Sequence, residues 1–142
     1  MGSIAPLYSE RVNYKIPPDR ITKRIAHWQG IVRSACEQCG RARVPKVAHP
    51  SSIAEWVRNT EADLKYVLHF GKRTAFGSNS RPHSIALLIG PEGGLTEEEV
   101  SLAISKNFIE IQLGPRVLRT ETASVVALSI LGEKWGDLSL KL

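Results

Sequence analysis

The sequence predicts an α/β domain with a mostly parallel sheet and helices on both faces of that sheet, and three observations support this fold class. Helix-like and strand-like segments alternate along the 142 residues. The stretch from Ser84 to Ile89 is rich in branched apolar residues, as in a strand covered on both faces. Two strand-like segments also end in glycine-proline turns, at Gly90-Pro91 and Gly114-Pro115, and each turn leads to a helix.

Periodicity and capping signals predict the helices. The first starts near Pro17-Pro18-Asp19, with Asp19 as a candidate N-cap, and Gly40 is its candidate C-cap. Its apolar face repeats every three or four residues through Ile21, Ile25, Trp28, Val32, Ala35 and Cys39. The other three are a short helix from Ser51 or Ser52 through Arg58, a helix over 97–106 with a Thr96–Glu99 capping box, and a last helix from Thr120 or Thr122 to about Trp135.

Strands are predicted over Leu64–Phe70, Ser84–Ile89 and Ile109–Leu113, with a short strand near Val44-Pro45. Residues 71–83 are polar and are predicted to form a loop. Residues 1–16 show no clear period, so we expect an N-terminal extension or linker there and a single domain over 17–142.

Composition excludes several classes of protein. Apolar residues make up 42% and charged residues 23% of the chain, which is typical of a globular domain. No apolar run approaches the roughly 18 residues of a membrane span, and no signal-peptide pattern opens the chain. We therefore expect a cytoplasmic protein with no membrane partner.

Charge is distributed unevenly. Residues 1–50 hold nine Lys/Arg and three Asp/Glu, a net of +6, whereas residues 51–142 have a net of −1. This asymmetry favours a polyanionic partner such as RNA, and a solvated basic helix face is the alternative. The candidate RNA-binding residues are Lys23, Arg24, Arg41, Arg43 and Lys46.

The two cysteines, Cys36 and Cys39, form an isolated C-x-x-C pair. A zinc site needs four ligands, and the four histidines are scattered without ligand spacing. We expect two reduced thiols and no metal site.

The two glycine-proline turns follow strands that are predicted to be parallel, so one crevice is expected between them. The order Gly90-x-x-Gly93-Gly94 is neither a dinucleotide fingerprint nor a phosphate-binding loop, and Glu92 would repel phosphate. S-adenosylmethionine, which has no phosphate and carries positive charge, fits this crevice. Two alternatives stay open: a dinucleotide-binding enzyme with Glu110 on the ribose, and turns that only cap helices.

Two segments carry a family resemblance. Ile89-Gly90-Pro91-Glu92-Gly93-Gly94-Leu95-Thr96 and Leu113-Gly114-Pro115-Arg116-Val117-Leu118-Arg119-Thr120-Glu121-Thr122-Ala123 resemble the signature pair of the RsmE-type 16S rRNA (uridine-N3) methyltransferases of the SPOUT superfamily. The segment from Ala35 to Pro45 and the closing Trp135-Gly136-Asp137-Leu138 are similar to the same family. The resemblance covers roughly residues 15–138.

The resemblance implies a C-terminal trefoil knot, a homodimer and S-adenosylmethionine as cofactor. It implies cofactor contacts from Leu68, Ile89, Gly90, Gly93, Gly94, Leu113, Gly114, Val117, Leu118, Thr120 and Ala123, with Leu118 against the adenine. The usual N-terminal PUA-like RNA-binding domain of the family is expected to be absent from this chain.

The implied reaction transfers a methyl group to N3 of a uridine in small-subunit ribosomal RNA. Arg119 and Arg116 are candidates to stabilise the uridine anion, and Glu92 or Glu121 are candidate bases or orienting groups. Two functional alternatives remain, namely a non-catalytic RNA-binding or ribosome-assembly module with this fold and the dinucleotide enzyme.

Overall fold

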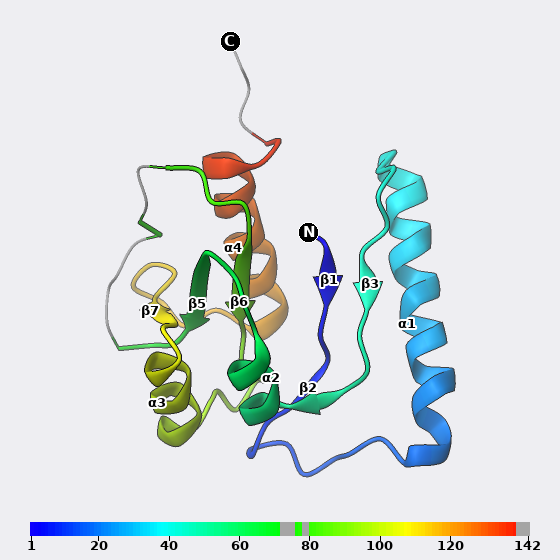
Figure 1. Ribbon diagram of the computed structural model, residues 1–142, viewed down its shortest axis with the longest axis horizontal. Helices are drawn as coiled ribbons and strands as arrows, with labels where there is room; N and C mark the ends of the chain where they lie inside the picture. The colour runs from blue at the N-terminus through cyan, green and yellow to red at the C-terminus, as the bar shows by residue number, and fades with distance from the viewer. Residues whose placement is uncertain (72–75, 78–79, 139–142) are drawn as a thin grey trace.

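Helices and strands alternate along the chain in the computed structural model, which describes residues 1–71, 76–77 and 80–138 (Figure 1). In chain order the elements are β1 (Ser3–Ile4), β2 (Leu7–Tyr8), α1 (Pro18–Cys39), β3 (Lys46–Val47), β4 (Ser51–Ser52), α2 (Ile53–Asn59), β5 (Leu64–Leu68), β6 (Ile85–Leu88), α3 (Glu97–Ser105), β7 (Ile109–Ile111) and α4 (Thr120–Trp135).

The main sheet has three strands in the order β6-β5-β7, and β5 pairs in parallel with both neighbours. In the register, Tyr66 of β5 lies between Leu87 of β6 and Ile109 of β7. This confirms the predicted parallel α/β fold. Because all three strands run the same way, their carboxyl ends meet at one edge of the sheet.

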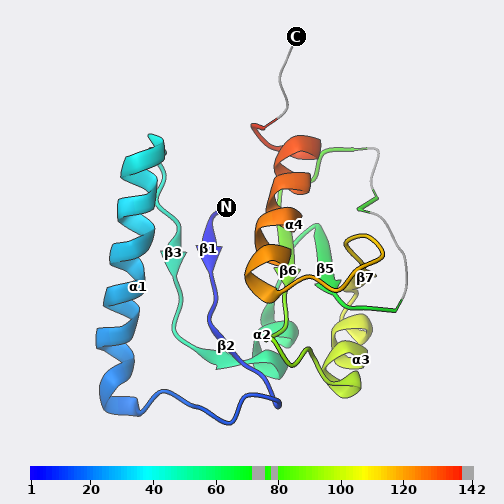
Figure 2. The same ribbon diagram turned by 180° about the vertical axis from the view of Figure 1, so that it is seen from behind.

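Side chains alternate across β5 and divide the core into two clusters, one on each face of the sheet. Val67 packs with α2 and α3 in a cluster that also includes Leu88 and Phe108. Tyr66 faces the other way and packs against Ala127 and Leu131 of α4. Figure 2 accordingly shows α4 in front of β6 when the molecule is seen from behind. Helices therefore cover both faces of the sheet.

Helix α1 stands beside β3, away from the main sheet (Figure 1). The side-chain amide of Gln29 holds it there, donating to the carbonyl of Pro45 at 2.9 Å and accepting from the amide of Val47 at 2.9 Å. On this helix only Cys36 is buried, so the predicted apolar face is at most partly covered in the single chain. Both Cys36 and Cys39 are free thiols.

The ends of α1 differ in how well the sequence predicted them. Gly40 adopts the left-handed conformation, with φ of 72°, and is the expected C-cap. Asp19 is not the N-cap, because the helix begins at Pro18 and Pro17 occupies the cap position without a side-chain bond. Proline fixes its own φ and needs no amide partner, so it can start the helix alone.

The first sixteen residues contain two short strands that the sequence pattern did not predict. β1 pairs in parallel with β3, and β2 pairs in parallel with β4. Each strand has only two residues, too few to show an alternating pattern. Beyond β2, the amide of Glu10 donates to Oε1 of Glu99 on α3 at 2.9 Å, which fastens the segment to the core.

The other predicted elements are confirmed with small shifts of their ends. β5 and β7 stop two residues earlier than expected, at Leu68 and Ile111. The capping box of Thr96 and Glu99 opens α3, and α4 begins at Thr120. Part of the predicted loop over 71–83 lies outside the described residues. Within the described residues, no helix is both long enough and apolar enough to cross a membrane.

The buried carboxylate of Glu99 joins three segments of the fold and provides a test of it. Its two oxygens accept from the backbone amides of Glu10 and Thr96, each at 2.9 Å. Replacing Glu99 with Ala leaves both amides without their acceptor, so we expect a loss of about 1–3 kcal/mol in the free energy of unfolding, measured with urea. The exposed neighbour Glu98 is the control, and Glu98→Ala should change stability by less than about 0.5 kcal/mol. Equal effects of the two variants would contradict this role of Glu99.

Candidate functional site

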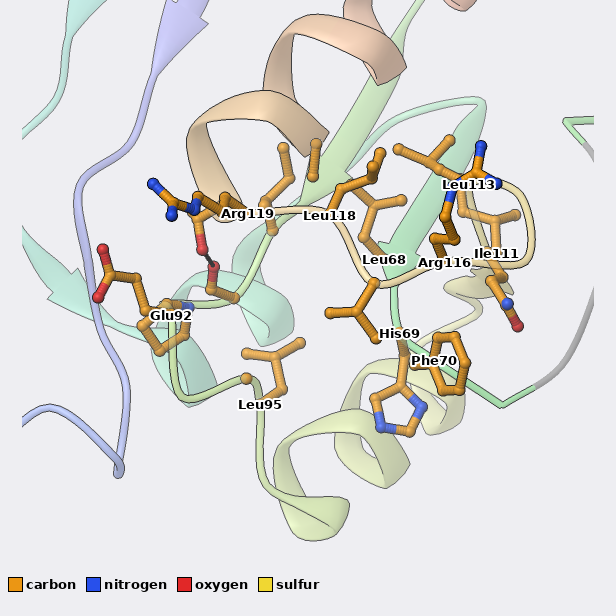
Figure 3. A pocket seen from close by; sticks show the side chains of 18 of the residues that line it. Leu68, His69, Phe70, Glu92, Leu95, Ile111, Leu113, Arg116, Leu118 and Arg119 are labelled. Atoms are coloured by element: carbon orange, nitrogen blue, oxygen red, sulfur yellow. Dashed lines mark hydrogen bonds between the residues drawn. The ribbon is translucent and has the colours of Figure 1, made fainter.

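A cleft of about 710 Å³ lies at the carboxyl edge of the main sheet, where β5, β6 and β7 end and α4 begins (Figure 3). Its walls are the turn after β6, the turn after β7 and the residues that follow β5. The turns predicted to face one another therefore do so, and the space between them is open.

Backbone geometry of the first turn explains two of its glycines. A Cβ on Gly90 would lie 2.8 Å from Cγ and 3.0 Å from the backbone nitrogen of Leu95, so no larger residue fits without moving the turn. Gly94 has φ of 74°, which side-chain-bearing residues rarely adopt, and its amide donates to the carbonyl of Pro91 at 2.8 Å. These constraints keep the turn tight enough for its backbone to border the cleft.

The second turn runs from Leu113 to Arg119, and the residue that follows it, Thr120 at the start of α4, is bonded to the first turn. The hydroxyl of Thr120 donates to the carbonyl of Gly90 at 3.2 Å, a bond between residues thirty positions apart. The side-chain amide of Gln112 donates to the carbonyl of Gly114 at 2.7 Å, and Gly114 has φ of 73°. One hydrogen bond thus joins the two walls of the cleft, and the bond from Gln112 stabilises the conformation of the second turn.

Most of the residues predicted to contact a cofactor line this cleft. They are Leu68, Ile89, Gly90, Gly94, Leu113, Val117, Leu118, Thr120 and Ala123. Gly93 and Gly114 are not among the lining residues, and of the two only Gly114 has a positive φ, of 73°. The lining is largely apolar, with backbone groups of both turns along it.

The predicted charged residues divide into two groups. Arg116, Arg119 and Glu92 line the cleft, whereas Glu121 does not and is exposed in the first turn of α4. Figure 3 shows Arg119 and Glu92 at one end of the cleft and Arg116 at the opposite end. Glu121 instead lies where a carboxylate favours the helix dipole.

Several lining residues were not predicted, among them Arg11, His69, Phe70, Leu95, Ile111 and Gln112. His69 and Phe70 directly follow β5. Ligands bind beyond the carboxyl ends of parallel strands, and applying this rule to β5 as well as to β6 and β7 would have found both residues. Arg11 carried no such signal, because it comes from the segment after β2. Its guanidinium donates to the carbonyl of Gly93 and so adds a cation to the rim of the cleft.

Glu110, the candidate ribose acid of a dinucleotide site, is engaged elsewhere. Its Oε1 lies 2.7 Å from Nδ1 of His69, and its side chain is only 12% exposed. It does not line the cleft. Because Glu110 lies outside the cleft lining, the structure gives no support to the dinucleotide alternative.

The candidate RNA-binding residues are all exposed and lie along and just after α1. Lys23 and Arg24 are on the helix, while Arg41, Arg43 and Lys46 follow it. The Arg41 guanidinium donates to the carbonyls of Met1 and Arg43, each at 3.1 Å, so this side chain also supports the local structure. Within the described residues, no group of three or more His, Cys, Asp or Glu side chains could hold a metal ion.

Comparison of the sequence with models of known protein families identifies the family of this chain. The model of the RNA methyltransferase domain matches residues 1–132. The chain belongs to this family. The match includes both turns, the cleft and the two short N-terminal strands.

Curated relatives include several proteins named ribosomal RNA small subunit methyltransferase E. The protein of that name from Buchnera aphidicola of Schizaphis graminum is 41% identical over 98% of this chain, and the one from Bacillus subtilis is 35% identical over 89%. These alignments cover 57% and 53% of the two relatives. The chain therefore spans about half the length of the curated relatives that it matches.

Solved structures agree with this placement. A Legionella pneumophila protein solved with bound SAM has a TM-score of 0.91 and 40% identity over 96% of this chain. Ribosomal RNA small subunit methyltransferase E from Neisseria gonorrhoeae, solved with S-adenosyl methionine, has a TM-score of 0.88 and 36% identity over 97% of this chain. Each alignment covers 57% of the solved chain.

Proposed function

We propose that this chain is the catalytic part of an S-adenosylmethionine-dependent methyltransferase that modifies N3 of a uridine in small-subunit (16S) ribosomal RNA. The observation that carries the proposal is the cleft between two bonded glycine-proline turns in a chain of the RNA methyltransferase domain family. The names of the curated relatives support the rRNA substrate, which would place the protein in the cytoplasm.

The residues present fit the cofactor. The cleft offers an apolar wall, including Leu68, Leu113 and Leu118, against which an adenine can pack, and backbone groups that can bond a nucleoside. Glu92 supplies a negative charge that favours a cationic ligand. When bound, S-adenosylmethionine supplies a methyl group activated by its sulfonium.

The charged side chains of the cleft would act on the uridine. Loss of the N3 proton leaves negative charge on N3 and on the neighbouring carbonyl oxygens. Arg119 and Arg116 stay protonated, and each can stabilise that charge when the uracil lies at its end of the cleft. Glu92 remains a candidate to orient the cofactor or the uracil. Glu121 is a weaker candidate for this role because it lies outside the cleft.

The same proposal includes a knotted C-terminus and a homodimer. The turn over 113–119 lies against the turn after β6, as expected if the chain passes through an earlier loop before entering α4. Helix α4 also leaves apolar side chains in solvent, with Val125 65% and Leu128 42% exposed. A second copy covering this face would remove that apolar area from water.

Calorimetry with S-adenosylhomocysteine and with NAD tests the cofactor assignment. We expect the first compound to bind and NAD not to bind. Gly90→Ala should weaken S-adenosylhomocysteine binding by at least about tenfold, because the added Cβ displaces the turn at Leu95. Gly93→Ala is the control, since its Cβ would meet only Arg11 atoms at 3.8 Å, and near-normal affinity is expected. Binding of NAD alone would contradict the assignment, and binding of neither compound would favour a non-catalytic module.

Arg119→Ala tests the catalytic role of the cleft. We expect it to retain S-adenosylhomocysteine affinity and to lose methyl transfer by on the order of 100-fold, because one stabilising group of the transition state is removed. Transfer of a labelled methyl group to unmethylated small-subunit rRNA measures the rate. Arg58→Ala at the exposed end of α2 is the control for loss of an arginine. A rate equal to that of the unmodified chain would remove Arg119 from the mechanism.

The basic surface of α1 is tested by the salt dependence of RNA binding. The double variant Lys23→Ala/Arg24→Ala should bind rRNA fragments more weakly and reduce the slope of log K against log salt by about 2, one unit for each phosphate that is no longer neutralised. Lys106→Ala, which removes an exposed charge after α3, should leave the slope unchanged. An unchanged slope in the double variant would identify Lys23 and Arg24 as solvated surface residues.

A further inference from the structure

The reaction needs a group that accepts the uridine N3 proton, and the cleft restricts the choice. Among the described residues that line it, only His69 and Glu92 carry an imidazole or a carboxylate, the side-chain groups that serve as general bases. The three lining arginines remain protonated. Glu92 is exposed, and among the described residues no hydrogen bond holds its carboxylate in place, whereas the imidazole of His69 is held by Glu110.

We propose that His69 is the general base that removes the N3 proton and that Glu110 positions its imidazole. This inference rests on the proposed function and deepens it. His69 follows β5 and Glu110 lies on β7, so the pairing of these two parallel strands brings the side chains together across 41 residues of sequence.

The geometry fixes which nitrogen is available. Nδ1 of His69 lies 2.7 Å from Oε1 of Glu110. An ionised carboxylate only accepts hydrogen bonds, so Nδ1 carries the proton and donates it to that oxygen. Nε2 is then the unprotonated nitrogen, and among the described residues it makes no hydrogen bond. The His69 side chain is 31% exposed, so a substrate can reach the ring.

The neighbourhood of His69 also suits an unstacked base. Phe70, the next residue, lines the cleft and is 55% exposed, although an aromatic ring is normally covered. Single RNA bases removed from a stack are commonly received on such exposed aromatic faces. Figure 3 shows His69 and Phe70 at the same end of the cleft, so a uracil stacked there would lie near the imidazole.

The step balances with the groups named. The N3–H bond breaks and the proton moves to Nε2 of His69. The electron pair left on N3 forms the bond to the methyl carbon, while the bond between that carbon and the sulfonium breaks and its electrons remain on sulfur. The products are N3-methyluridine and S-adenosylhomocysteine, and the imidazolium then returns its proton to water. Glu110 stabilises the transient imidazolium and remains a carboxylate throughout.

A first experiment reads the imidazole without any turnover. ¹⁵N NMR of the chain should show His69 protonated at Nδ1 and unprotonated at Nε2. Glu110→Ala should shift the ring toward the Nε2–H form that free imidazole side chains prefer, whereas Glu110→Gln retains an acceptor oxygen and should largely preserve the Nδ1–H form. An Nε2–H ring in the unmodified chain would overturn the proposal.

A second experiment measures the reaction. His69→Ala and His69→Gln should bind S-adenosylhomocysteine with unchanged affinity and transfer methyl groups at least about 100-fold more slowly. Added imidazole should restore part of the rate to His69→Ala, which a purely structural role would not allow. His83→Ala, an exposed histidine outside the cleft, is the control. If the unmodified chain transfers methyl groups and both His69 variants do so at the same rate, this inference fails while the proposed function stands. If the unmodified chain binds no S-adenosylhomocysteine, the proposed function itself fails.

Discussion

The parallel pairing of β5 with both of its neighbours is the constraint on which the rest of this structure depends. It brings the carboxyl ends of three strands to one edge, so that residues from three distant parts of the sequence border a single cleft. The bond from Thr120 to Gly90 then fixes the distance between the two turns. A two-sided core supports this edge, because α2 and α3 cover one face of the sheet and α4 covers the other. This arrangement brings together the side chains that determine the chemistry of the cleft.

The N-terminal segment belongs to the site as well as to the fold. After β2, Glu10 is bonded to the helix that follows the first turn, and Arg11 is bonded to the turn itself. Residues 1–50, which carry the excess of positive charge, are therefore bonded to the wall of the cleft through Glu10 and Arg11.

Local signals predicted much of the fold and most of the cleft. The capping box at Thr96, the left-handed Gly40 and the glycine-proline turns each depend on residues close together in sequence, and each was found where expected. The residues that were missed depend on distant partners. Glu110 entered only as the ribose acid of an alternative function, and its pairing with His69 was missed because that pairing depends on strand order, which no local pattern encodes. Arg11 contacts Gly93 across 82 positions, and two-residue strands leave no period to detect.

A crystal structure of this chain with S-adenosylhomocysteine tests the central claim most directly. The account predicts a folded ligand between residues 89–94 and 113–119, with its adenine against Leu118 and backbone groups of both turns bonded to it. Density for the ligand at another surface, or a cleft closed by the protein's own side chains at saturating ligand, would contradict it.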